Sequence, residues 1–131
     1  MERRILDTNV IVRHLVGDDK PLAAQARKLF ARCDHGELAL VVLSAVVAET
    51  VFVLDSFYQH PRAKIARIMK IFLTSPGVEL TDLDMHLAAL NRYGKTRLHF
   101  VECLIAEHAA AHRCAVASFD KDLRKITGEK A

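Results

Sequence analysis

The sequence has few of the residues that mark secreted, disulfide-bonded or loop-rich proteins. Its three cysteines are odd in number and show no C-x-x-C spacing, so they indicate neither a disulfide framework nor a zinc site. Three prolines and five glycines leave no linker at which a domain boundary would fall. We therefore expect a single domain over residues 1–131 in a reducing cytoplasm, with disorder confined to residues 127–131.

Long hydrophobic runs are also missing. The most apolar stretch, residues 38–54, is shorter than the roughly 20 residues of a membrane-spanning helix and contains Glu49. The opening "MERRILD" has only a few apolar residues before an acid, which argues against a secretory signal. No glycine loop for binding phosphate occurs. The net charge of +3 permits a nucleic-acid partner without requiring one.

Apolar runs and helical patterns alternate along the chain. The runs predict strands, and the patterns between them predict helices, the second opening at Pro21 and the third capped by Ser44. Alternation of this kind is typical of an α/β protein, here a three-layer α/β/α domain with a mainly parallel central sheet. The expected strands are 3–6, 39–42, 77–80 and 114–118, and the expected helices are 8–15, 21–34, 44–58, 62–73, 82–93 and 99–112.

Four carboxylates interrupt this apolar pattern. Asp7 lies in "RRILDTNVIV", where capping of the next helix is the simplest explanation. Glu49 and Glu102 lie in the apolar helical stretches "LALVVLSAVVAETVFVL" and "HFVECLIAEHAAAH". Burial there would be costly without a partner, which for Glu49 could be an arginine. Asp120 follows the fourth expected strand as Asp7 follows the first, and ligands bind beyond the carboxyl ends of parallel strands.

Carboxylates that converge would repel one another unless a cation or protons compensated their charge. An all-oxygen ligand set matches Mg²⁺ or Mn²⁺ better than zinc. A metal ion of this kind can activate water for attack on a phosphodiester. The acids therefore predict a metal site for phosphodiester hydrolysis.

These segments, taken in order, resemble the PIN-domain ribonucleases, and among them the VapC-type toxins of prokaryotic toxin–antitoxin pairs. The likeness runs through "ILDTN", "SAVVAETVFVL", "HFVECLIAEHA" and "SFDKDL" and covers nearly the whole chain. It implies a PIN-like fold and a Mg²⁺- or Mn²⁺-dependent endoribonuclease that cleaves tRNA or rRNA. It also implies a homodimer inhibited by a cognate antitoxin protein. The metal-binding and catalytic residues would be Asp7, Glu49, Glu102 and Asp120.

The resemblance assigns supporting roles to several polar residues. Thr8, Asn9 and Ser118 would hydrogen-bond to the carboxylates and orient them. The third acid is Glu102 where the family more often has Asp, and His99 stands where many relatives carry an additional Asp. His99 and Asp122 are therefore candidate auxiliary residues.

Basic residues form two groups. "PRAKIARIMK" carries Arg62, Lys64, Arg67 and Lys70, which form either a solvated helix face or an RNA-contacting one. Arg92, Lys95 and Arg97 precede the Glu102 helix and are the better candidates for contacting RNA phosphates. Phe57 and Tyr58 are candidate partner contacts, with core packing as the alternative. A PIN nuclease of RNA processing without an antitoxin, and a non-catalytic PIN-like binding module, stay open as other functions.

Overall fold

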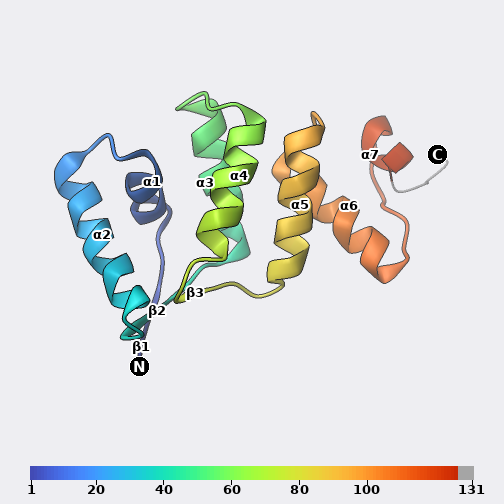
Figure 1. Cartoon of the computed structure of the whole chain (residues 1–131). Helices are drawn as coiled ribbons and strands as arrows, with labels where there is room; N and C mark the ends of the chain where they lie inside the picture. Colours follow the sequence, from blue (N-terminus) through green and yellow to red (C-terminus); the bar gives the residue numbers. More distant parts are fainter. Residues whose placement is uncertain (127–131) are drawn as a thin grey trace.

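Three short parallel strands form the sheet of the computed structural model, which describes residues 1–126 (Figure 1). The strands are β1 (Glu2–Ile5), β2 (Leu38–Val41) and β3 (Val78–Glu79), in the order β1-β2-β3. Arg3 pairs with Ala39, and Leu40 pairs with Val78. Residues 127–131, for which we expected disorder, lie outside the described part of the chain.

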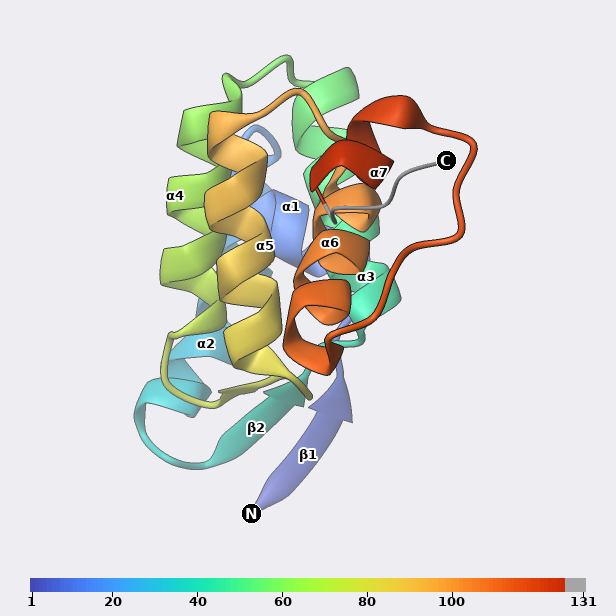
Figure 2. The same cartoon turned by 90° about the vertical axis from the view of Figure 1, so that its right-hand side faces the viewer.

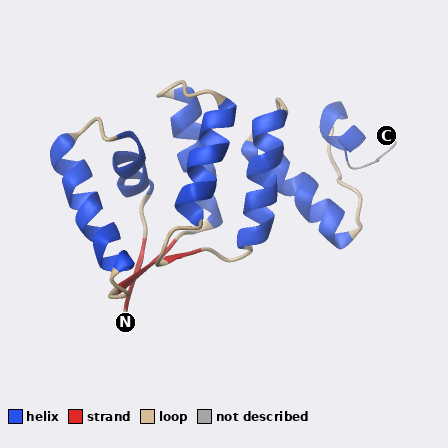
Figure 3. Ribbon diagram, viewed as in Figure 1, coloured by secondary structure: helices blue, strands red, loops and turns tan. Residues whose placement is uncertain are grey.

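Helices make up most of the remaining chain (Figure 3). They surround the sheet in a three-layer α/β/α arrangement, which confirms the expected fold class. The pattern of apolar residues predicted the fourth helix with the bounds that it has, whereas the short seventh helix was not predicted. The helices are α1 (Thr8–Val16), α2 (Lys20–Asp34), α3 (Ser44–Ser56), α4 (Arg62–Leu73), α5 (Leu83–Lys95), α6 (Phe100–His112) and α7 (Lys121–Ile126).

The middle strand β2 is buried, whereas β1 is exposed along its whole length. Leu38 and Leu40 belong to the hydrophobic core, while Ile5 at the end of β1 is 71% exposed. Because β1 pairs only with β2, its other edge carries no neighbouring strand among the described residues. The sheet is therefore anchored by its central strand.

Helix packing follows the apolar stripes of the sequence. In α4, Ile65, Met69 and Phe72 recur at helical spacing and are buried, and α4 packs on α5 as α5 packs on α6. In α3, Val47 and Leu54 are buried between α1, α4 and α6. Packing of α3 on both α1 and α6 places the elements that carry Asp7, Glu49 and Glu102 next to one another.

The turn before β3 requires glycine. Gly77 has φ of +78°, and a Cβ there would lie 2.6 Å from Cβ of Cys33 on α2. Its carbonyl accepts a hydrogen bond from the Leu40 N–H over 2.7 Å. The close approach therefore joins α2, β2 and β3 at one point.

The fourth strand, predicted at 114–118, is absent, and the chain runs there as an irregular segment between α6 and α7 (Figure 2). A strand needs a neighbour for its backbone hydrogen bonds, and no ladder partner stands beside this segment in the described structure. The Cys114 N–H instead donates to the Ala109 carbonyl at the end of α6, and Phe119 is fully exposed. An apolar run predicts extended backbone, but it does not supply a partner strand.

The expected cap of the third helix is also wrong. The N-cap position is Leu43, and Ser44 is the first helical residue. The buried His86 donates through Nδ1 to the Asp82 carbonyl at 2.9 Å, so its Nε2 accepts from the Ser44 hydroxyl at 2.7 Å. Ser44 therefore joins α3 to α5.

Within residues 1–126, no helix combines the length and apolar character needed to cross a membrane.

Candidate functional site

Asp7 stands directly after β1, at the N-cap of α1. It is exposed, and its Oδ1 accepts a hydrogen bond from the backbone N–H of Thr8 over 2.9 Å. The Thr8 side chain is buried and that of Asn9 is exposed, and neither hydrogen-bonds to the Asp7 carboxylate. The capping position suggested by the sequence is thus confirmed, and the second carboxylate oxygen has no hydrogen-bond partner among residues 1–126.

Glu49 lies in the middle of α3, and its side chain is exposed. The burial expected from the apolar sequence is wrong, because the buried side of α3 is formed by other positions, including Thr50, whose hydroxyl donates to the Val46 carbonyl at 2.7 Å. Glu49 has no hydrogen bond or ion pair with any residue that the structure describes, so the alternative of a salt bridge to an arginine is not found either. Its carboxylate is free to bind a ligand.

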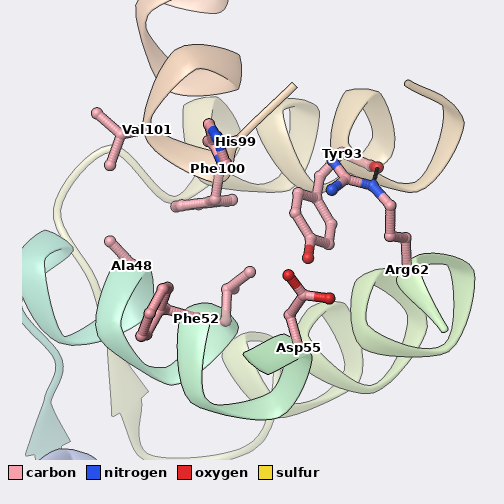
Figure 4. Close-up of a pocket in the computed structure, with 9 residues that line it drawn as sticks. Ala48, Phe52, Asp55, Arg62, Tyr93, His99, Phe100 and Val101 are labelled. Atoms are coloured by element: carbon pink, nitrogen blue, oxygen red, sulfur yellow. Dashed lines mark hydrogen bonds between the residues drawn. The ribbon is translucent and has the colours of Figure 1, made fainter. Parts of the chain in front are cut away.

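Glu102 lies in the first turn of α6 and is partly exposed. Its Oε1 accepts a hydrogen bond from the backbone N–H of His99, the N-cap residue, over 2.9 Å. A carboxylate at this position satisfies a helix N–H and interacts favourably with the helix dipole. The exposed His99 side chain lies at the same end of α6, beside Phe100 (Figure 4).

Asp120 lies just before α7, and its Oδ1 accepts from the Leu123 N–H at 3.0 Å. The Asp120 N–H donates to the Ser118 hydroxyl at 2.9 Å, so Ser118 does contact this residue, although through the backbone rather than the carboxylate. Asp122 is exposed in the first turn of α7. Without a fourth strand, Asp120 is held by α7 and not by the edge of the sheet.

The four acids have the right chemistry for Mg²⁺ or Mn²⁺, since each offers carboxylate oxygens and none forms an ion pair with another residue in the described part of the chain. Their positions, however, do not form a metal-binding site in the structure. Among residues 1–126, no group of three or more His, Cys, Asp or Glu side chains lies within reach of one ion. The donor set fits the metal, whereas the spacing of the donors as described does not.

The basic candidates differ in how far they are occupied. Arg92 donates to Glu107 at 3.1 Å in a partly buried ion pair, which limits its use as a phosphate ligand. Lys95 and Arg97 are exposed and unpaired in the described structure. On α4, Arg62 donates to a backbone carbonyl of α5, and Lys70 donates to Asn91. Lys64 and Arg67 are the exposed cations of that helix.

A cleft between α3 and the α5–α6 region was not predicted from the sequence (Figure 4). On one side of the Tyr93 ring, the Arg62 guanidinium stacks 3.7 Å from the ring centroid and donates to the Tyr93 and Leu98 carbonyls. The Asp55 carboxylate points toward the Tyr93 hydroxyl at the tip of the ring (Figure 4). Burial raises the pKa of the Tyr93 phenol, an effect that Arg62 opposes and Asp55 strengthens. The phenol therefore keeps its proton at neutral pH.

Carboxylates at the carboxyl end of a parallel strand and on adjoining helices are typical of α/β proteins that bind oxygen-ligated metal ions. The chain belongs to the PIN domain family, whose model matches residues 4–129. PIN domains are generally nucleases that use divalent metal ions, so the family implies a nucleic-acid substrate. No curated protein and no solved structure gave a significant match.

Proposed function

We propose that this protein is a Mg²⁺- or Mn²⁺-dependent endoribonuclease that acts in the cytoplasm. Membership of the PIN family carries the proposal. The range that the family model matches contains Asp7, Glu49, Glu102 and Asp120, which we propose as the metal ligands and catalytic residues. When bound, the metal supplies an activated water and stabilises charge on the phosphodiester. Thr8, Asn9 and Ser118 are proposed to support these acids, and His99 and Asp122 to assist them.

The activity is tested with purified protein and RNA in the presence and absence of metal. Cleavage is expected with Mg²⁺ or Mn²⁺ and is expected to stop in EDTA, with products carrying 5′-phosphate and 3′-hydroxyl ends, because water and not the ribose hydroxyl attacks. Cleavage in EDTA, or products ending in cyclic phosphate, would contradict the mechanism.

Glu49→Gln separates chemistry from folding most cleanly. The exposed Glu49 side chain has no hydrogen bond or ion pair with residues 1–126, so the free energy of unfolding should change by less than about 0.5 kcal/mol. Loss of cleavage, together with weaker Mn²⁺ binding by calorimetry, is the expected result. The matched control is Asp34→Asn, which removes an exposed carboxylate at the end of α2 that has no hydrogen bond or ion pair with the described residues.

We further propose that the protein is the toxin of a type II toxin–antitoxin pair, cleaving tRNA or rRNA, and that it forms a homodimer. Phe57 is 75% exposed at the end of α3, which suits a contact with a partner. Tyr58 is partly buried and donates to Asp18 at 2.8 Å, so its phenol already has a role within the chain. A PIN nuclease without an antitoxin would lack both a short reading frame upstream and a co-purifying small protein.

A non-catalytic binding module is the second candidate function. It is favoured by the capping bonds of Asp7, Glu102 and Asp120, which give these acids a structural use, and by the absence of a three-acid cluster within residues 1–126. Calorimetry with Mn²⁺ distinguishes the two functions. A nuclease should bind the ion through these carboxylates, whereas a binding module should show no metal-dependent signal and should leave RNA intact.

A further inference from the structure

The cleft between α3 and the α5–α6 region encloses about 210 Å³ (Figure 4). Its walls are largely apolar and include the aromatic rings of Phe52, Tyr93 and Phe100. The volume lies below the roughly 300 Å³ at which pockets for drug-sized ligands begin, so a small group fits it better than a large ligand.

Two polar groups face one another at this cleft, the buried Tyr93 hydroxyl and the exposed Asp55 carboxylate, and neither has a hydrogen-bond partner among residues 1–126. The Tyr93 residue is only 2% exposed, and its hydroxyl forms no hydrogen bond. The Asp55 carboxylate faces it and makes neither a hydrogen bond nor an ion pair with the described residues. Leaving a buried hydroxyl without a partner costs free energy, and a ligand with both donors and acceptors would remove that cost.

The surroundings favour a base of RNA as that ligand. Phe52 is 66% exposed, and exposed aromatic rings serve as stacking platforms for unpaired bases. His99 lines the cleft, the exposed Arg97 lies two positions before it, and the chain carries a net charge of +3, so an anionic backbone would be attracted.

We propose that this cleft holds one unpaired base of the RNA substrate and favours guanine, an inference that rests on the proposed ribonuclease function. Guanine presents two adjacent donors, N1–H and N2–H, to the Asp55 carboxylate, and its O6 can accept from the Tyr93 hydroxyl. Adenine and cytosine offer the carboxylate a single amino group, and uracil offers a single ring N–H. The edge of the base thus determines the preference.

Two residues that line the cleft are also sequence neighbours of proposed metal ligands. Ala48 and Val101 line it, and Glu49 and Glu102 follow them directly on α3 and α6. A base bound here would fix the position of the RNA backbone relative to these two carboxylates. The cleft would accordingly select the cleavage site rather than merely raise affinity.

Binding of nucleoside 5′-monophosphates to the full chain in EDTA tests the proposal without requiring catalysis. Guanosine monophosphate is expected to bind about tenfold more tightly than the other three, within the range typical of one bidentate contact to a base, and to shift amide signals of α3 and α6 in NMR spectra. Asp55→Asn should abolish the preference, and Tyr93→Phe should weaken binding. The matched controls are Asp84→Asn and Tyr58→Phe, which remove the same groups outside the cleft.

Equal affinity for all four nucleotides, or an unchanged preference in Asp55→Asn, would overturn the proposal. So would the finding that a second copy of the chain occupies the cleft, seen in sedimentation as a weaker dimer for Phe52→Ala and Asp55→Asn with no effect on nucleotide binding. A protein that prefers guanosine monophosphate but cleaves no RNA keeps this inference and contradicts the proposed function. Metal-dependent cleavage without any nucleotide preference supports the proposed function and overturns this inference.

Discussion

The Glu102 carboxylate accepts a hydrogen bond from the backbone N–H of His99 across 2.9 Å, closing the first turn of α6. The same side chain is a proposed metal ligand, so two roles compete for one carboxylate. Because Oε1 makes the helix bond, Oε2 is the oxygen left for a cation. Substitutions that keep one role and remove the other separate the two.

Glu102→Gln should keep the cap and lose the activity. Glutamine accepts the same bond at this helix position, so the free energy of unfolding should stay near that of the parent. Glu102→Ala loses the bond as well and should cost about 1 kcal/mol. Denaturant unfolding measures both variants alongside RNA cleavage. If Glu102→Gln cleaves RNA as well as the parent does, the side chain is a cap and no ligand.

Asp7→Asn applies the same reasoning at the end of β1. Asparagine caps a helix about as well as aspartate, so stability should hold. A direct metal ligand should matter more than an outer-sphere partner, so cleavage should fall by more than roughly 10–100-fold. Asp120→Asn should behave alike, since Oδ1 of Asp120 also caps a helix. Full activity in both variants would remove these acids from the proposed site.

How much the sequence revealed depended on whether the signal was local. The helix at Arg62–Leu73 was predicted correctly because its apolar stripe lies within the segment itself. The strand at 114–118 was wrong because pairing depends on a neighbour elsewhere in the chain. Glu49 was expected in a buried helix, yet an apolar helix in a small domain still has an exposed side.

The same contrast between local and non-local signals holds for the candidate site residues and the cleft. Asp7, Glu49, Glu102 and Asp120 were predicted as site residues from motifs that each lie within a short segment, and they stay a prediction. The approach of Asp55 to Tyr93 could not be predicted, because it depends on how α3 and α5 lie relative to one another in the fold. A tyrosine in an amphipathic helix predicts burial but gives no sign that its hydroxyl lacks a partner.

Arg62→Lys should destabilise the packing of α4 on the α5–α6 connection. The guanidinium donates to the carbonyls of Tyr93 and Leu98 while stacking on the Tyr93 ring, and a lysine cannot make both bonds in this geometry. The loss should be roughly 1.5–3 kcal/mol, as for hydrogen bonds to charged groups. Chemical denaturation measures it. Arg67→Lys is the control, because Arg67 is exposed on the same helix and has no hydrogen bond or ion pair with residues 1–126. Equal stability of the two variants would contradict the structural role of Arg62.

His14 should make the fold sensitive to mild acid. Its ring stacks on Phe30 with centroids 4.2 Å apart, and its Nδ1 is buried without a partner among the described residues. Burial lowers the pKa of the imidazole, and the charge of Arg27 lowers it further. As the pH falls through the unfolded pKa of about 6.5, the unfolded chain takes up a proton that the folded chain resists, so stability is lost below that pH and is fully present above it.

His14→Leu should therefore lose less stability than the parent between about pH 8 and pH 5.5, around the reference value for histidine. Urea unfolding at both pH values measures the difference, with His112→Leu at an exposed position as the control. Parallel loss of stability in the parent and in His14→Leu would show that another group sets the acid response.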